Sequence, residues 1–555
     1  MSESINIGVF ICNCGNKISD YIDLEEVEKF AESLDNVTFV KRLPYSCSKD
    51  GKRFISKVIK EKNLTHFIVA GCSPRIFENI FRNLAEEAGL NSYLFEMVNI
   101  REQCAWVHID SEEKALLKAK KLVGMGVAKV KESKPLDVIE EEVIPSALII
   151  GGGITGITSA ISLAEKNVKV LLVEKEKELG GMLKNLYKIY PTMINARDFI
   201  RNRIKKIESI PGIEILTNAR VTSVSGCVGN YDVVITQNNR EIKKNAGIII
   251  VAAGAKALQP ENPDYGKSDK VISQMDLERM LLENDKRLKN PGKVVMFQCE
   301  GVRNNERPYC ARVCCITAIK NAIILKEMSP QADITILYRD IPAFNEKDRK
   351  RAELSGINFI QYNYAEPVKI LEDVILFTGT ETKRSGDLPY NLLVLSVPVV
   401  PDEQSEELHN ILGIPLDENG FLVEKQVRLK PGKYVPRGIY VAGNVHWPAN
   451  TFESIAQGYS AASRGYVVLK NKKIEIEPVV VSYDSETCRG CGRCVEVCEF
   501  NAVELFDTGS GIKQVKFNSI MCKGCGVCTV VCPSGALQPQ VISKKQIDSM
   551  LGVFV

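Results

Sequence analysis

The chain has 555 residues, of which 45% are hydrophobic and 25% are charged, an ordinary globular composition with room for several domains. Its 72 basic and 69 acidic residues leave a net charge of +3, too small a field to recruit nucleic acid or an acidic membrane. The N-terminus has no basic segment before an apolar stretch, and the long uncharged run Val143 to Ala164 is broken by Pro145 and four glycines. We therefore expect a soluble cytoplasmic protein with no secretory signal, no membrane span and no nucleic-acid partner.

Cysteine spacing is the strongest chemical signal in the sequence. Of the 18 cysteines, all but Cys227 fall into three groups, at residues 12–104, 299–315 and 488–532. In a reducing compartment, cysteines at such spacing are more often metal ligands or redox groups than halves of disulfides. Each group is therefore a candidate iron–sulfur site.

The first group belongs to a predicted α/β domain at residues 1–135. Cys12 and Cys14 follow a predicted strand, Cys47 lies in the loop LPYSCSKDG, and Cys72 follows the strand of HFIVAGCSPR. Three strand-end loops of one α/β domain can meet at a shared edge, so these four cysteines are predicted to ligate one [4Fe–4S] cluster. Cys104 is either a further ligand or a near neighbour.

A flavin site is predicted from residue 144 onward. An apolar strand runs into Gly151, Gly153 and Gly156 and then into a helix, the G-x-G-x-x-G arrangement that places a pyrophosphate on a helix N-terminus. The next strand ends in Glu174, which can accept hydrogen bonds from an adenosine ribose. The segments IIIVAAGA and GIYVAGN, with the helix after them, complete a pattern typical of FAD; a nucleotide fold without its nucleotide is the alternative. The predicted FAD contacts are Gly151, Gly153, Gly156, Glu174, Lys175, Gly181, Met182, Ala253, Gly254, Gly443, Asn444, Ser454, Ile455 and Ala456.

These flavin segments resemble those of thioredoxin reductases, which implies a core of two dinucleotide-binding domains. The FAD domain would be split into residues 144–290 and 403–475, with a second nucleotide domain at 291–402. Asn444 stands where an aspartate usually meets the ribityl chain, and both side chains offer an oxygen acceptor. No C-x-x-C lies near the flavin segments, so we expect no direct dithiol exchange with a protein substrate.

The second nucleotide domain departs from its expected pattern. PGKVVMF and DITILYRD are predicted to be its first two strands, yet the segment between them contains a single glycine, Gly301. Such a loop cannot bring its backbone to a pyrophosphate, so we predict that NADH does not reduce the flavin directly.

That segment carries the second cysteine group. If RPYCARVCC begins a helix, Cys310 and Cys314 share one face, and Cys299 approaches from the strand end. With Cys315 they are predicted to hold another [4Fe–4S] cluster near the flavin; a vicinal disulfide or simple buried cysteines are the alternatives. Lys320 is placed either to reach the isoalloxazine or to be an ordinary surface lysine.

The third group has the spacing of a two-cluster ferredoxin, in a predicted α+β domain at residues 478–545. C-x2-C-x2-C-x3-C occurs twice, and in this pattern the fourth cysteine of each run ligates the other cluster. A structural zinc site is the alternative. One predicted ligand set is Cys488, Cys491, Cys494 and Cys532. The other is Cys522, Cys525, Cys528 and Cys498.

Motifs from all parts of the chain form one pattern: GVFICNCG, GCSPR, NIREQCAWVH, GGGITG, QCEG with YCARVCC, VAGN and the two ferredoxin runs. Together they closely resemble the family of heterodisulfide reductase A-type subunits over essentially the whole chain. The resemblance implies a flavin-based electron-bifurcating or confurcating subunit of methanogens and other anaerobes, with one FAD, four [4Fe–4S] clusters and a lysine matching Lys320 beside the flavin. The implied partners are ferredoxin, B- and C-type subunits of heterodisulfide reductase, and a hydrogenase or formate dehydrogenase δ-type subunit, with the chain as a homodimer in a larger complex.

The chain also departs from the methanogen form of that family. An additional ferredoxin domain inserted in the flavin domain is missing, since KIYPTMINARDFI runs on without such cysteines. The alternative function is a non-bifurcating electron relay, in a multi-subunit reductase or in a complex that activates another metalloenzyme.

Overall fold

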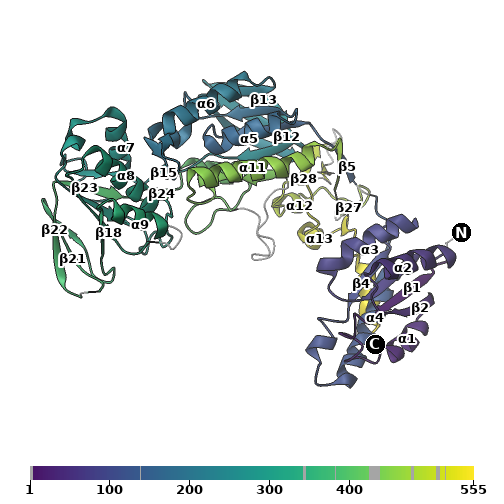
Figure 1. Cartoon of the computed structure of the whole chain (residues 1–555). Coiled ribbons are helices and arrows are strands. Elements are labelled where there is room, and N and C mark those ends of the chain that lie inside the picture. Colours follow the sequence, from purple (N-terminus) through teal and green to yellow (C-terminus); the bar gives the residue numbers. More distant parts are fainter. Residues whose placement is uncertain are drawn as a thin grey trace. The chain divides into compact units, whose positions relative to one another are not determined.

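The computed structural model describes residues 4–137, 139–341, 346–381, 383–423, 438–476, 480–507, 513–518 and 521–554. The chain forms two compact units, one made of Met1–Glu140 with Glu475–Val555 and the other of Glu141–Ile474. Their sheets confirm the predicted α/β fold class, with a flavoprotein-type core and a small α+β region near the C-terminus (Figure 1). The finer domain limits stay predictions.

A four-stranded parallel sheet of order β2-β1-β3-β4 forms the N-terminal part of the first unit. The inner strands β1 and β3 are buried throughout, because helices α1 and α4 pack on one face and α2 and α3 on the other. Helix α3 begins with Pro74 and is ended by Gly89 in the left-handed conformation. The elements are β1 (Ile7–Cys12), α1 (Leu24–Glu32), β2 (Val37–Leu43), α2 (Lys49–Glu61), β3 (His66–Gly71), α3 (Pro74–Ala88), β4 (Phe95–Asn99) and α4 (Glu112–Lys131).

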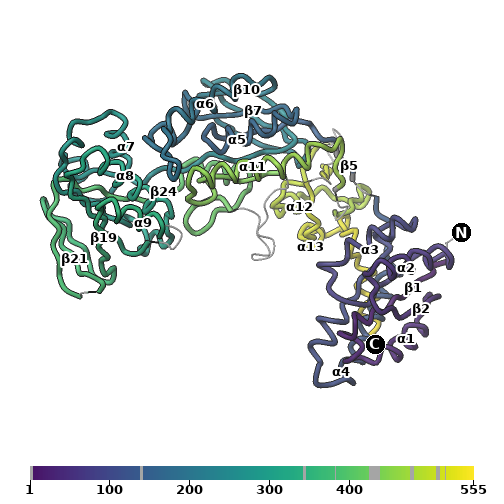
Figure 2. Tube along the Cα trace, in the orientation of Figure 1, coloured from purple at the N-terminus to yellow at the C-terminus, as the bar shows by residue number. Residues whose placement is uncertain are grey.

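The second unit contains a first five-stranded parallel sheet, of order β10-β7-β6-β14-β25. Helices α5 and α11 lie side by side on it although they are far apart in the sequence (Figures 1 and 2). The Ser159 hydroxyl of α5 donates to the Gly458 carbonyl of α11 at 3.0 Å, and a side chain at Gly458 would meet the Thr155 carbonyl at 2.8 Å. The elements are β6 (Ser146–Ile150), α5 (Ile154–Ala164), β7 (Lys169–Val173), α6 (Ala196–Ser209), β10 (Ile213–Leu216), β14 (Ile248–Val251), β25 (Ile439–Val441) and α11 (Thr451–Leu469).

A second five-stranded parallel sheet, of order β16-β23-β17-β18-β19, follows in the same unit. Its centre is the predicted strand–helix–strand joint, formed by β17, α8 and β18. The elements are β16 (Val271–Ser273), α7 (Gln274–Glu283), β17 (Lys293–Gln298), α8 (Cys314–Met328), β18 (Asp333–Tyr338), α9 (Glu346–Leu354), β19 (Asn358–Gln361) and β23 (Leu392–Ser396).

Smaller elements border these sheets. Two three-stranded antiparallel sheets comprise β11 (Ala219–Cys227), β12 (Asn230–Gln237) and β13 (Arg240–Ala246), and β20 (Lys369–Ile370), β21 (Val374–Thr378) and β22 (Ser385–Pro389). Paired short strands are β5 (Ile139–Glu142) with β26 (Lys473–Ile476), β8 (Lys188–Ile189) with β9 (Ile194–Asn195), and β15 (Lys256–Ala257) with β24 (Val399–Val400). Helix α10 spans Gln404–Leu412.

The C-terminal region of the first unit is built from two antiparallel strand pairs and two short helices. Glycines in the left-handed conformation precede both helices, at Gly492 and Gly526. The elements are β27 (Val481–Tyr483), α12 (Arg493–Glu496), β28 (Val503–Asp507), β29 (Lys513–Phe517), α13 (Val527–Val531) and β30 (Leu537–Pro539). Within the described ranges, no helix is both long and apolar enough to span a membrane.

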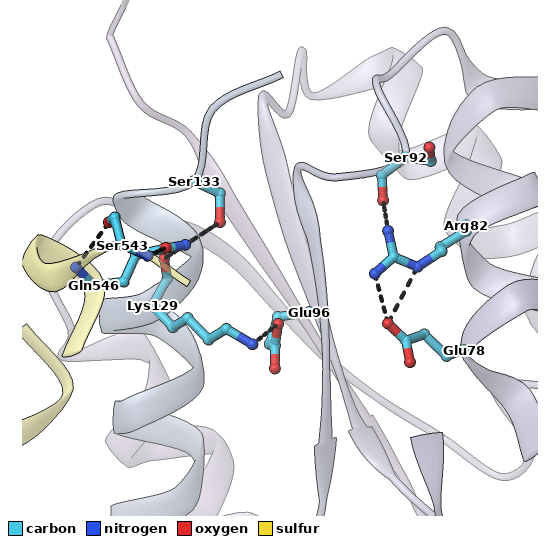
Figure 3. Close-up of polar contacts among 8 residues, drawn as sticks. All are labelled: Glu78, Arg82, Ser92, Glu96, Lys129, Ser133, Ser543 and Gln546. Atoms are coloured by element: carbon cyan, nitrogen blue, oxygen red, sulfur yellow. Dashed lines mark hydrogen bonds and ion pairs between the residues drawn. The ribbon is translucent and has the colours of Figure 1, made fainter. Parts of the chain in front are cut away.

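The last helix, α14 (Lys544–Gly552), packs against α4 (Figure 3). The buried Gln546 side chain donates to Ser133 Oγ at 3.1 Å and to the Lys129 carbonyl at 3.4 Å. It also accepts the Ser543 amide at 2.7 Å, which completes a capping box. Lys129 in turn pairs with Glu96 of β4 at 2.7 Å, so one polar chain connects the C-terminal helix to the N-terminal sheet.

We predict that Gln546→Ala loosens α14, because it removes the two hydrogen bonds that α14 donates to Ser133 and to the Lys129 carbonyl, together with half of the capping box. The expected loss is about 1–2 kcal/mol of local stability, or roughly 5- to 30-fold faster hydrogen exchange of α14 amides. Lys545→Ala is the matched control, since Lys545 is 78% exposed and pairs with Glu132 only at the surface. Equal exchange in the two variants would contradict the prediction.

Candidate flavin and iron–sulfur sites

A cavity of about 1280 Å³ opens between the two parallel sheets of the second unit. Its walls come from the turn after β6, the end of β7, the segment after β14, the start of α11, and the first turns of α8. Of the predicted FAD contacts, ten line this cavity: Gly151, Gly153, Glu174, Lys175, Gly181, Met182, Ala253, Gly254, Asn444 and Ser454. The other four, Gly156, Gly443, Ile455 and Ala456, do not.

The turn after β6 has the geometry of a phosphate cradle. Gly151 has φ +110°, and a side chain there would meet the Ala252 carbonyl at 2.2 Å. A side chain at Gly156 would meet the Gly151 carbonyl at 1.9 Å, so Gly156 serves close packing of turn and helix. Gly153, which caps α5, faces open space within 4 Å. The amide end of α5 is therefore uncovered, as an FAD pyrophosphate requires.

Two polar residues close the ends of this cradle. Glu174 is buried, accepts the Gly152 amide at 2.6 Å and the Glu176 amide at 2.8 Å, and still lines the cavity. Asn444 Oδ1 accepts the Ala449 amide at 2.6 Å, which holds the turn before α11. Both residues therefore shape the cavity through backbone contacts as well as offering acceptors to it, and the cavity fits FAD.

Helix α8 begins at Cys314, so the condition on which the helical interpretation of RPYCARVCC rested is not met. Cys310 lies in the preceding loop because Arg312 adopts φ +59°, which a right-handed helix cannot accommodate. The cysteines nevertheless converge. Cys315 interacts electrostatically with Cys314, Cys299 and Cys310.

The converged cysteines fit a cluster beside the flavin cavity. Burial raises the pKa of Cys299 to about 12, so its thiolate form would be favoured by a cationic metal centre. Cys314 also lines the large cavity, and both Cys314 and Cys315 are free thiols. The Arg312 guanidinium joins the cysteine loop to the flavin side by an ion pair with Glu453 of α11 at 2.7 Å.

Lys320 lines the flavin cavity and is not a surface lysine, since its side chain is only 4% exposed. Its ammonium group pairs with the fully buried Glu278 of α7 and donates to the Lys188 carbonyl at 2.9 Å. Burial lowers the pKa of Lys320, whereas the Glu278 carboxylate raises it. Sequence reasoning missed Glu278, although its helical spacing from Gln274 and Leu281 places it on the face of α7 that is buried.

A second cavity, of about 500 Å³, lies at the carboxyl end of β17, where a nucleotide loop would be expected. It is lined by Cys299 and by three carboxylates, Glu261, Glu300 and Glu366, with Arg339 as a cation. Burial raises the pKa of Glu300. The acidic lining opposes a pyrophosphate, in agreement with the loss of the glycine-rich loop.

The N-terminal cysteines also come together. Cys12, Cys14, Cys47 and Cys72 line one cavity of about 260 Å³ at the carboxyl edge of the first sheet. The Ser46 amide donates to Cys12 Sγ at 3.4 Å, and burial raises the pKa of Cys72 to about 12. Four thiols with a backbone donor around a small cavity fit a [4Fe–4S] cluster.

Cys104 lies outside that cavity. It is fully buried, and its thiol donates to the Ala115 carbonyl of α4 at 3.0 Å. Burial raises the pKa of Cys104 to about 11. The structure therefore places Cys104 as a neighbour of the set.

The ferredoxin cysteines form two groups with a crossed fourth member. The strongest electrostatic neighbours of Cys494 are Cys491, Cys488 and Cys532. Those of Cys528 are Cys522, Cys525 and Cys498, with Cys494 after them.

Backbone amides point at these sulfurs, from Gly490 to Cys488 at 3.5 Å, from Gly524 to Cys522 at 3.4 Å and from Ala502 to Cys498 at 3.3 Å. Such donors fit cluster-bound thiolates. In the described part of the chain, no three histidine, cysteine or acidic side chains are grouped to hold a single metal ion. That finding concerns mononuclear sites, because a cubane with four irons needs more widely spaced thiolates. The ligand assignments themselves stay predictions.

Comparison with known proteins adds the class of protein. The pyridine nucleotide-disulphide oxidoreductase family matches residues 145–465, and the 4Fe-4S dicluster domain family matches residues 487–536. The chain is therefore an oxidoreductase subunit that combines an FAD-type redox core with a ferredoxin-type domain for [4Fe–4S] clusters.

Individual relatives narrow this class. The chain is 33% identical to an iron-sulfur A-type subunit of the CoB–CoM heterodisulfide reductase of Methanopyrus kandleri, over 91% of this chain and 92% of that protein. It is also 33% identical to the A-type subunit of the H(2):CoB-CoM heterodisulfide,ferredoxin reductase of Methanothermobacter thermautotrophicus, over 91% of each. The chain thus belongs to the family of heterodisulfide reductase A-type subunits. Among solved structures, thioredoxin reductase of Lactococcus lactis is similar at 20% identity and a TM-score of 0.42, over 59% of this chain and 99% of that one.

We predict that Gly153→Ala folds normally but binds FAD more weakly. The residue has φ −76°, which alanine adopts freely, and its new methyl group would enter the open space above α5. An added methyl group in a fitted site costs about 1–3 kcal/mol, or roughly 5- to 150-fold in FAD affinity. Gly552→Ala, also in open space but on α14, is the control and should keep its FAD. FAD content and dissociation constant are the measurements, and full affinity in Gly153→Ala would refute the assignment of the cradle.

We also predict that Glu278→Gln destabilises the second unit, since it leaves the buried ammonium group of Lys320 without a counter-charge. The expected cost is about 3–5 kcal/mol in the free energy of unfolding, and Glu278→Gln with Lys320→Met should recover most of it. In Glu278→Gln, the pKa of Lys320 in the folded state lies further below its value in the unfolded chain. The loss of stability should therefore shrink as pH rises above that folded pKa, because the buried amine is then neutral and carries no penalty.

Urea denaturation followed by flavin fluorescence, at several pH values, measures this effect. Glu283→Gln, at an exposed position of the same helix, is the control and should change stability by less than about 0.5 kcal/mol. A double variant no more stable than Glu278→Gln would show that the pair is not the cause.

Proposed function

We propose that this chain is the electron-bifurcating or confurcating subunit of a heterodisulfide-reductase-type complex, with ferredoxin as its low-potential partner. One observation carries the proposal: Cys314 and Lys320, both on α8, line the same flavin cavity. One helix therefore connects a candidate cluster to the flavin directly. FAD, when bound, supplies the ability to exchange electrons singly or in pairs.

The residues around the cavity have separate tasks in this proposal. The Lys320 ammonium group places a positive charge at the cavity wall, which favours negative charge inside, and the Glu278 carboxylate raises the pKa of Lys320 against the opposing effect of burial. Arg312 and Glu453 hold the cysteine loop against the flavin-binding helix. The acidic second cavity and the missing glycine-rich loop keep NADH from serving as the donor.

Four [4Fe–4S] clusters are proposed, two of ferredoxin type, one at the N-terminal cavity and one at the loop before α8. Ferredoxin appears in the name of the Methanothermobacter relative, and heterodisulfide reductase in the name of the Methanopyrus relative. The proposed assembly is a homodimer in a larger complex with B- and C-type subunits and a hydrogenase or formate dehydrogenase δ-type subunit.

A redox titration of the purified protein tests the bifurcating function. Bifurcation requires that the flavin take up its two electrons in a single cooperative step, and added NADH should leave the flavin oxidised. Two well-separated one-electron steps would instead indicate a simple relay and sink the proposal.

Cys314→Ser tests the cluster beside the flavin. Four cubanes correspond to about sixteen irons per chain, and the variant should lose about four of them while keeping its FAD. The matched control is Cys227→Ser, because Cys227 lies on β11, apart from the cysteine groups, and this variant should keep all of its iron. An unchanged iron content in Cys314→Ser would remove this cluster from the proposed path.

A further inference from the structure

The N-terminal cavity contains a charged side chain that the proposed flavin path does not use. Arg101 follows β4 and is only 14% exposed, and its Nη1 donates to Cys14 Sγ at 3.0 Å. We propose that Arg101 is a positioning residue that raises the reduction potential of the N-terminal cluster through this hydrogen bond. The inference rests on the proposed function, in that the four cysteines must hold a cluster.

Backbone hydrogen bonds fix the position of the Arg101 main chain. The amides of Ile100 and Arg101 both donate to the Gly71 carbonyl, at 2.9 and 3.1 Å. Gly71 is the last residue of β3 and directly precedes Cys72. The end of β4 is therefore tied to the strand end that presents one of the candidate ligands.

The turn after Arg101 is held equally firmly. The Glu102 amide donates to Asn99 Oδ1 at 3.0 Å, and the Ala105 amide donates to the Ile100 carbonyl at 3.0 Å. Beneath the turn, the Cys104 thiol donates to the Ala115 carbonyl of α4. This contact gives Cys104 a role as an anchor for the Arg101 turn.

The guanidinium group is oriented so that one nitrogen remains for the sulfur. Its Nε and Nη2 edge donates to Glu102 Oε1, at 3.1 and 2.6 Å. The Trp106 ring lies 4.9 Å from the guanidinium carbon and stacks on it. With that edge occupied, Nη1 is directed at Cys14.

This arrangement favours the reduced state of a cluster. Reduction adds negative charge, and a hydrogen bond from a cation to a ligand sulfur stabilises that charge, more strongly in a dry cavity than in water. Glu102 opposes the effect, but it contacts the edge of the guanidinium that faces away from Nη1. Within the part of the chain that the structure describes, its other oxygen, Oε2, is buried without a hydrogen-bond partner.

The test is an EPR-monitored redox titration of the full-length protein. Arg101→Gln should keep the iron content but shift the N-terminal cluster to a more negative potential, leaving the other clusters unchanged. Glu102→Gln should shift it the opposite way, because an opposing negative charge is lost. Lys17→Gln is the control, since Lys17 lines the same cavity but is exposed, and its loss should move the potential little.

An unchanged potential in Arg101→Gln, or an equal shift in Lys17→Gln, would overturn the inference. A shift in the same direction for Glu102→Gln would also overturn it. Cys72→Ser identifies which signal belongs to the N-terminal cluster. If Cys72→Ser lost neither iron nor an EPR signal, the N-terminal cluster itself would be absent, and the proposed function would fail. That outcome is distinguishable from a cluster that is present but whose potential does not depend on Arg101.

Discussion

The first turns of α8 border two candidate sites at once, and this constraint couples the cysteine loop to the flavin cavity. Cys314 and Cys315 open the helix and belong to the cysteine set, while Lys320 lies further along it at the wall of the flavin cavity. Because a helix is rigid over this length, the two sites cannot move independently. The buried pairing of Lys320 with Glu278, and its bond to the Lys188 carbonyl, fix the helix against both halves of the unit.

The N-terminal cysteine set and the set before α8 share one backbone feature, although they lie on different sheets. In each, a cysteine just beyond a central strand adopts a left-handed backbone, Cys14 with φ +53° and Cys299 with φ +66°. This conformation is costly for a residue with a side chain. It turns the chain sharply at the carboxyl edge of a parallel sheet, the edge at which such folds bind their ligands. An edge suited to nucleotides thereby presents cysteine side chains.

Sequence patterns located the strands, the flavin turn and the cysteine groups because these depend on local spacing. They failed where one backbone dihedral angle set the start of a helix, or where a residue distant in sequence determined the burial of a side chain. The helix expected to include Cys310 begins only at Cys314, since Arg312 has φ +59°. Lys320 could not be told from a surface lysine, because its partner Glu278 lies on another helix and is brought beside it only by packing.

By itself the sequence determined the chemistry available to this protein: thiols in ligand spacing, a glycine turn for a pyrophosphate, and no second glycine-rich loop. These are properties of residue type and of separation along the chain. Only the tertiary structure decided which groups share a cavity, that Cys314 borders the flavin cavity, that Arg101 rather than Cys104 reaches the N-terminal set, and that a lysine is buried against a glutamate. Those pairings depend on how parallel strands align their ends and how helices cover them, which spacing along a chain does not encode.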